Sequence, residues 1–216
     1  MRAISSREWM FLAVILIFSF VPTFGGLLRV AGLFGGPVIG PQNIRALTDP
    51  LPIVLHVLAS FLFCLLGALQ FLPSVRRYHL ARHRTMGRVV ATAGCTSALT
   101  GLWMTHFYSF PQELQGTLLY WVRIALSLSM FFLIVWAVIA VRSRNISGHR
   151  ASMVRAYAIG QGASTQAMLG IGGMVLLGTE LMGPARDTMM VAAWGINLLI
   201  AELLIINVPR TRAARA

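Results

Sequence analysis

The sequence contains no lysine, and its six acidic residues are outnumbered by eighteen basic residues, all of them arginine. Charged residues make up only 11% of the chain, whereas soluble domains carry about 25%. The chain also lacks the GxSxG, HExxH and GxxxxGK[ST] motifs of hydrolases, metalloproteases and phosphate-binding loops. These absences exclude an ordinary soluble enzyme and leave an integral membrane protein as the expected class.

Cysteine and charge exclude two further classes. Cys64 and Cys95 are the two cysteines, and both lie within apolar stretches without a CxxC motif or a zinc-type Cys/His cluster. We interpret them as small buried side chains. The net charge of +12 does not predict a nucleic-acid partner, because the arginines lie in short segments between apolar stretches. There they orient helices and contact anionic lipid.

The apolar residues occur in long runs. Hydrophobic residues make up 57% of the chain, and its mean hydropathy is +0.75. A helix needs about 20 residues to cross the hydrocarbon core of a bilayer. Six stretches are long enough, at residues 9–31, 51–73, 87–110, 117–141, 156–177 and 188–208. We therefore expect an all-α, polytopic membrane protein, in which residues 1–216 form a single six-helix transmembrane bundle.

The distribution of arginine predicts the orientation of that bundle. Most arginines lie in the N-terminal segment and in the second, fourth and final hydrophilic segments, whereas the opposite loops hold only Arg45 and Arg186. Cytoplasmic loops are enriched in Arg and Lys. We expect both termini to be cytoplasmic and the protein to span a bacterial cytoplasmic (inner) membrane several times.

A first candidate site lies near the outer surface. The second predicted helix begins at the outer surface, and His56 lies about 8 Å below that surface. His106, on the third predicted helix, lies about 6 Å below the same surface. Two imidazoles facing one another can bind the iron of a b-type haem, and Arg29 and Arg123 at similar depth can bond its propionates. A quinone head or a lipid phosphate suits these arginines equally well. Alternatively, the histidines bond to neighbouring helices and Arg29 extends its charge to the interface.

A second candidate site lies at the cytoplasmic ends of the helices, where the sequence repeats a phrase as HRTMGRVVA and HRASMVRAYA. Arginine at the start of a helix opposes the helix dipole, so a lipid phosphate or Glu202 should lie nearby. Gln70 and Glu202 are expected to be buried and to need partners. This group can be a structural clamp or a proton or substrate site. The predicted inner polar clamp or anion site comprises Gln70, His83, Arg84, Arg88, His149, Arg150, Arg155 and Glu202.

Four motifs in order resemble a known family: LHVLASFLFCLLGALQF, RRYHLARHRTMGR, GHRASMVRAYA and WGINLLIAELL. Over about residues 51–206 the chain is similar to the bacterial predicted membrane proteins catalogued as domain of unknown function 2306. The resemblance implies a multi-helix membrane fold and no established activity. The chain departs from the family pattern at Val89 and Val90, where an aromatic residue is usual. The resemblance marks His56, Gln70, His83, Arg84, Gly87, Arg88, His149, Arg150, Met153, Arg155, Asn197 and Glu202.

Three functional hypotheses follow, and the sequence leaves open whether the protein is an enzyme. The first is a redox or electron-transfer component that binds haem b or a quinone at His56 and His106. The second is a non-catalytic accessory or scaffold subunit of a larger membrane complex, which binds lipid through its basic cytoplasmic loops. The third is a transporter, which ranks last because Pro22 is the only sign of a discontinuous helix.

Overall fold

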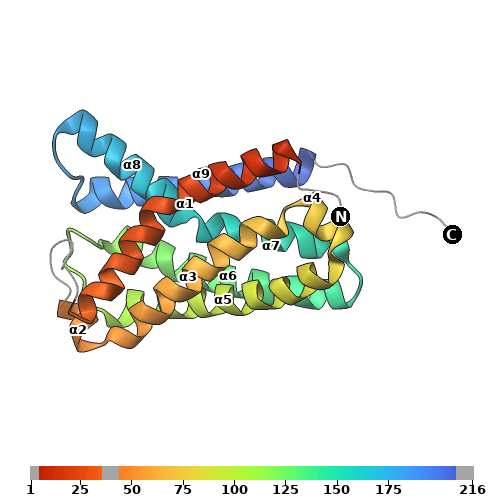
Figure 1. Cartoon of the computed structure of the whole chain (residues 1–216). Coiled ribbons are helices and arrows are strands. Elements are labelled where there is room, and N and C mark those ends of the chain that lie inside the picture. Colours follow the sequence, from red (N-terminus) through yellow and green to blue (C-terminus); the bar gives the residue numbers. More distant parts are fainter. Residues whose placement is uncertain (1–4, 36–43, 208–216) are drawn as a thin grey trace.

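The computed structural model of the chain describes residues 5–35 and 44–207, and within these residues it contains helices and no strand (Figure 1). In the described part of the chain, four helices are long and apolar enough to cross a membrane: α1 (Ser6–Leu33), α3 (Pro50–Gln70), α6 (Thr117–Arg142) and α9 (Gly183–Asn207). They correspond to the first, second, fourth and sixth predicted helices. The prediction of a membrane protein with several apolar helices is confirmed.

The end of the second helix and the start of the third differ from the prediction. The second ends at Gln70 and not at residue 73, and Pro73 instead begins the short helix α4 (Pro73–Tyr78). Proline suits a first helical position because it has no N–H to leave unpaired. The third helix, α5 (Leu80–Phe107), begins before residue 87 and includes the basic segment. A further short helix, α2 (Ile44–Thr48), precedes α3.

The prediction of one continuous fifth helix is wrong. Its residues belong to α7 (Ile146–Gly160) and α8 (Gly162–Leu177), which are separated at Gln161. Glycine lies on each side of this position, and glycine weakens a helix because it loses more backbone freedom on folding. A Cβ at position 162 would collide with the indole of Trp194. Pro22, in contrast, lies within α1 without ending it.

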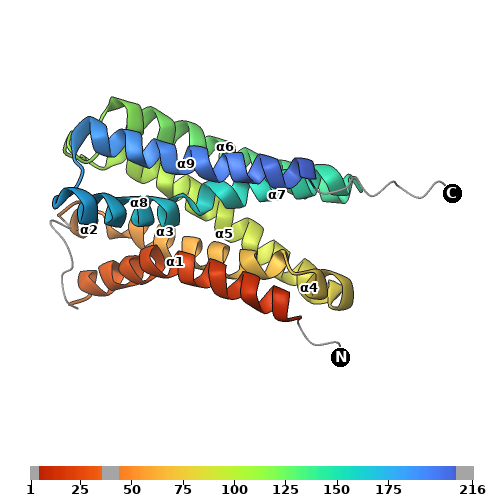
Figure 2. The ribbon, with the colours of Figure 1, turned by 90° about the horizontal axis from the view of Figure 1, so that it is seen from above.

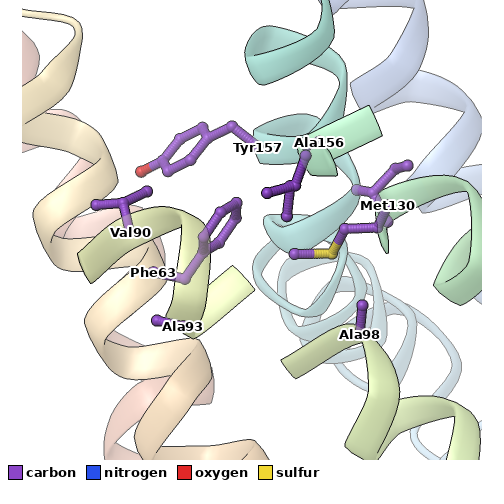
Figure 3. Packing of buried hydrophobic residues seen from close by; sticks show 9 residues of the cluster. Phe63, Val90, Ala93, Ala98, Met130, Ala156 and Tyr157 are labelled. Atoms are coloured by element: carbon purple, nitrogen blue, oxygen red, sulfur yellow. The ribbon is translucent and has the colours of Figure 1, made fainter. Parts of the chain in front are cut away.

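Helices α3, α5, α6 and α7 pack around a common interior, and α1 and α9 cover two sides of it. Figure 2 shows α8 between α1 and α9, where it contacts both. The interior is filled by large side chains from α3, α6 and α7, including Phe63, Met130 and Tyr157 (Figure 3). Gly94 of α5 permits this packing, because a Cβ there would lie 2.6 Å from Phe63 Cε2.

The arginine-rich end of the bundle, which we call the basic end, is where α1 begins, α3 ends, and α5 and α7 begin. Glu8 connects two of these elements: its Oε2 accepts a hydrogen bond from the Ser5 N–H at 2.9 Å, and its Oε1 accepts one from the Ser74 N–H at 2.7 Å. The carboxylate thus caps the starts of both α1 and α4. The arginines at this end are Arg7, Arg76, Arg77, Arg82, Arg84, Arg88, Arg142, Arg144, Arg150 and Arg155.

Candidate functional site

Three side chains at the basic end carry buried polar atoms that have no hydrogen-bond partner: Gln70 Nε2, Ser74 Oγ and His83 Nδ1. No other described residue has a buried side-chain nitrogen or oxygen in this condition. Gln70 ends α3, Ser74 lies in α4 and His83 lies in the first turn of α5. Buried polar groups are nearly always paired, so three unpaired atoms at one end of the bundle make that end a candidate site. We call these three residues the basic site.

Gly87 shapes the contact between α3 and α5 within this site. It follows His83 by one helical turn and therefore lies on the same face of α5. A Cβ at Gly87 would lie 3.5 Å from Gln70 Oε1. The glycine thus gives the Gln70 amide access to the α5 surface that also carries His83.

Positive charge surrounds the basic site. Burial lowers the pKa of the His83 imidazole, and the nearby Arg76, His149 and Arg84 lower it further in that order. His83 precedes the apolar part of α5, so these charges lie at the end of the bundle. Glu8 is the acidic residue beside the site. Its oxygens accept the backbone hydrogen bonds of Ser5 and Ser74 and the hydroxyl of Ser5, and its carboxylate also interacts with the Ser74 side chain, so Gln70 and His83 are the residues left for a ligand. The site therefore offers donors and positive charge to an anion.

His149 lies in α7 at the basic end, and its hydrogen bond defines its tautomer. Its Nδ1 lies 2.9 Å from the carbonyl oxygen of Ala137, and a carbonyl only accepts hydrogen bonds, so Nδ1 carries the proton. The Nε2 of a neutral His149 is then an acceptor. This arrangement also holds α7 against α6.

The predicted inner clamp is not one group, which corrects the sequence interpretation. Glu202 forms a two-point ion pair with Arg155, with Nε–Oε1 at 2.5 Å and Nη2–Oε2 at 2.8 Å. Their side chains are 36% and 41% exposed, and the pair joins α7 to α9 only. Among the described residues, Arg88 and Arg150 form no ion pair with Glu202. The charged pair and the basic site are thus separate features of the same end, because the pair joins α7 to α9, whereas the basic site lies on α3, α4 and α5.

The structure does not bring His56 and His106 together. His56 Nδ1 bonds to the Ser97 carbonyl oxygen at 3.0 Å, whereas His106 is exposed and its Nδ1 lies 2.9 Å from the Tyr120 hydroxyl. Residues 97–101 of α5, against which His56 packs, lie about 10 Å along the helix from His106. The expectation of equal depth is therefore wrong: α5 ends at Phe107 and not at residue 110, so His106 lies in its last turn, whereas His56 lies about 9 Å from the start of α3.

The two predicted arginines of that site also separate. Arg29 is exposed on α1, whereas Arg123 of α6 is half-buried and acts electrostatically on His56. Of the four residues predicted for the outer site, the structure thus places His56 and Arg123 near each other. No group of three or more His, Cys, Asp or Glu side chains suited to a metal ion occurs in residues 5–35 and 44–207.

The break between α7 and α8, which the sequence analysis did not predict, contains a polar network; we call it the polar break. Gln161 Nε2 donates to the Tyr157 hydroxyl at 2.9 Å, and that hydroxyl donates to the Cys64 carbonyl at 2.8 Å. Gln161 Oε1 accepts from the hydroxyls of Ser19 at 3.1 Å and Ser164 at 2.8 Å. The side chain of Gln161 thus joins α1, α3, α7 and α8.

Helix α9 completes the polar break. The Trp194 indole N–H donates to the Ile159 carbonyl at 3.1 Å, and the Asn197 amide donates to the Ala158 carbonyl at 3.2 Å. The Thr165 hydroxyl donates to Asn197 Oδ1 at 2.7 Å. Carbonyls at a helix end lose their helical partners, and in an apolar environment they must find others. The sequence signals available were Gly160 and Gly162 around Gln161 and the Trp-Gly-Ile-Asn motif.

Comparison with known proteins gives one family. A family model described as predicted membrane protein (DUF2306) matches residues 53–205. No curated protein and no solved structure matches the chain. The matched residues include the basic site and most of the polar break.

Proposed function

The chain belongs to the DUF2306 family of predicted membrane proteins, and from the basic site we propose that it binds the anionic head group of a membrane lipid. The observation that carries this proposal is the grouping of the unpartnered atoms of Gln70 and His83 beside arginine side chains. We place this end at the cytoplasmic face, where anionic lipids attract basic residues. In this proposal α5 and the α7–α8 pair complete six crossings of a bacterial inner membrane.

The chemistry of the site favours a phosphate oxygen. The free Gln70 nitrogen is a donor only, and the His83 imidazole can also donate. Arg76 and Arg84 add positive charge near the imidazole. Hydrogen bonds from such groups to an ionised oxygen are about twice as strong as those between neutral groups. A phosphodiester therefore satisfies atoms that the protein leaves unpaired.

The surroundings favour a lipid over a soluble anion. Tyr78 and Leu80 are 51% and 46% exposed, and they flank the connection between α4 and α5. Exposed aromatic and aliphatic residues beside arginines are typical of a membrane interface. A lipid can place its phosphate on the donors while its chains contact this apolar surface.

The test compares the wild-type protein with a Gln70→Leu/His83→Leu variant in phosphatidylcholine nanodiscs with and without phosphatidylglycerol. We expect phosphatidylglycerol to raise the melting temperature of the wild type and to be retained in native mass spectrometry. The double variant should bind it at least about a hundredfold more weakly, since two charge-assisted bonds are lost and each contributes roughly 1.5–3 kcal/mol. The variant keeps every arginine, so general attraction to anionic lipid is unchanged.

Arg142→Gln/Arg144→Gln is the matched control, because it removes two exposed charges at the same end without touching the site. It should retain the preference for phosphatidylglycerol. An equal response of wild type and Gln70→Leu/His83→Leu would contradict the proposal. A parallel series with inorganic phosphate separates the two sources of the anion: full protection by phosphate alone would indicate a soluble ligand and overturn the assignment to lipid.

A further inference from the structure

Arg123, near the opposite end of the bundle, is a half-buried cation without an acidic partner. Its Nη1 donates to Gln115 Oε1 at 2.5 Å, and its guanidinium carbon lies 5.5 Å from the centre of the Phe110 ring. Within residues 5–35 and 44–207 the only ion pair is Arg155–Glu202. Charged side chains within membrane helices are costly and usually face a partner or a ligand. Arg123 therefore has donors available for an anion.

Asp187, the acidic residue that acts electrostatically on Arg123, already accepts hydrogen bonds from the backbone. Its two carboxylate oxygens accept hydrogen bonds from the backbone N–H groups of Gly116 at 3.2 Å and Leu119 at 3.3 Å. The carboxylate is buried and caps the start of α6, where the helix dipole favours it. It therefore serves the helix end and leaves the guanidinium without a direct counter-ion.

His56 contributes an acceptor near this guanidinium. Its Nδ1 faces the Ser97 carbonyl oxygen at 3.0 Å and the Thr100 hydroxyl at 3.2 Å. The Thr100 hydroxyl donates to the Thr96 carbonyl at 2.7 Å, so both groups accept from the imidazole. Nδ1 thus carries the proton, and Nε2 of the neutral ring is an acceptor.

Gly101 of α5 allows His56 of α3 and Ser127 of α6 to approach each other. A Cβ there would lie 3.3 Å from His56 Cε1 and 3.6 Å from Ser127 Oγ. Ser127 follows Arg123 by one turn of α6 and shares its face. Side chains of α3 and α6 therefore meet over a glycine of α5, and Arg123 lies one helical turn from that contact and acts electrostatically on His56.

We propose that Arg123 and His56 bind the carboxyl group of a lipid-soluble carboxylic acid such as a fatty acid. A neutral carboxyl group presents a carbonyl acceptor to the guanidinium and a hydroxyl donor to His56 Nε2. Transfer of that proton to Nε2 leaves a carboxylate, which accepts from both the guanidinium and the imidazolium and supplies the counter-ion that Arg123 lacks. The site lies between membrane helices, so its ligand enters from the bilayer. This proposal concerns the end opposite the basic site and does not depend on it.

The test measures binding of lauric acid and of methyl laurate to the full chain in phosphatidylcholine nanodiscs. Methyl laurate has the same chain but neither the charge nor the hydroxyl. We expect the acid to bind and the ester to bind at least tenfold more weakly. Arg123→Gln and His56→Gln should each weaken acid binding by about tenfold. Arg29→Gln is the matched control, because it removes an exposed arginine of α1, and it should bind the acid like the wild type.

Two further variants keep the test decisive if Arg123→Gln folds poorly. Arg123→Lys keeps the charge without the planar guanidinium and should bind with intermediate affinity. Gly101→Ala removes no polar group, yet its Cβ would crowd His56, so it should weaken binding. Equal binding of acid and ester, or wild-type affinity in both Arg123→Gln and Gly101→Ala, would overturn the proposal. The Gln70→Leu/His83→Leu variant should bind lauric acid normally, which separates this test from that of the basic site.

Discussion

The polar break and the basic site place similar side chains among apolar helices, but they satisfy them in opposite ways. At the break, both ends of the Gln161 amide are hydrogen-bonded within the protein. At the basic site, the Gln70 nitrogen has no partner although it is buried. The two glutamines thus show that a polar residue in a membrane helix is not by itself a sign of ligand binding.

The difference separates structural from ligand-binding roles. The polar break uses α9 to pair the carbonyls that α7 releases, as the bonds from Trp194 and Asn197 show. Irregular backbone at membrane depth is tolerated when it is buried in protein in this way. The basic site leaves buried donors unpaired beside arginines, and an anion would satisfy them. Substitutions at the two places should therefore change stability in different directions.

The largest effect is expected from Gly162→Ala at the polar break. The new Cβ would collide with the Trp194 indole, whose N–H pairs the Ile159 carbonyl, so the substitution both overpacks the contact and threatens that bond. We expect a loss of about 3 kcal/mol in the free energy of unfolding, measured as a lower melting temperature in detergent. Gly172→Ala in α8, where nothing lies within 4 Å of the new Cβ, is the control and should gain up to about 1 kcal/mol.

The paired substitutions Gln161→Leu and Gln70→Leu test the comparison directly. Gln161→Leu removes the partner of Ser19, Tyr157 and Ser164, and we expect a loss of about 1–2 kcal/mol. Gln70→Leu removes an unpaired nitrogen, so without anionic lipid it should be neutral or stabilising by about 1 kcal/mol. Thermal unfolding in phosphatidylcholine measures both. An equal loss in the two variants would show that Gln70 is paired in the membrane and would remove the basis of the basic site.

The positions of the long apolar helices could be predicted from the sequence, because the length and hydropathy of a helix do not depend on its neighbours. The apolar runs located α1, α3, α6 and α9 to within a few residues at most ends, since the bilayer sets the length of each. The break at Gln161 did not follow, because small residues in a membrane helix predict close packing equally well. Its cause lies in Trp194 and Asn197 of α9, whose contact with α7 depends on the tertiary arrangement.

The candidate sites were predicted less well for the same reason. Counting residues inward from each loop gave His56 and His106 equal depth. However, α5 ends at Phe107, which leaves His106 in its last turn, whereas His56 contacts Ser97 and Thr100 further along the helix. The contact between Glu202 and a basic residue was expected, and the structure shows Arg155 as its partner. Which of several arginines pairs with one glutamate depends on helix rotation, which the sequence pattern does not specify.

The smallest effect is expected at the Arg155–Glu202 pair, which lies at the same end as the basic site but is internally paired. Because both side chains are more than a third exposed, solvent weakens the attraction, and Glu202→Gln should cost less than about 1 kcal/mol. Glu202→Gln should also leave the response to phosphatidylglycerol unchanged, since Arg155 pairs with α9 away from Gln70 and His83. Melting temperatures with and without phosphatidylglycerol measure both effects. A lost lipid response in Glu202→Gln would show that the charged pair belongs to the lipid site, and the division between paired and unpaired polar groups would then fail at this end of the bundle.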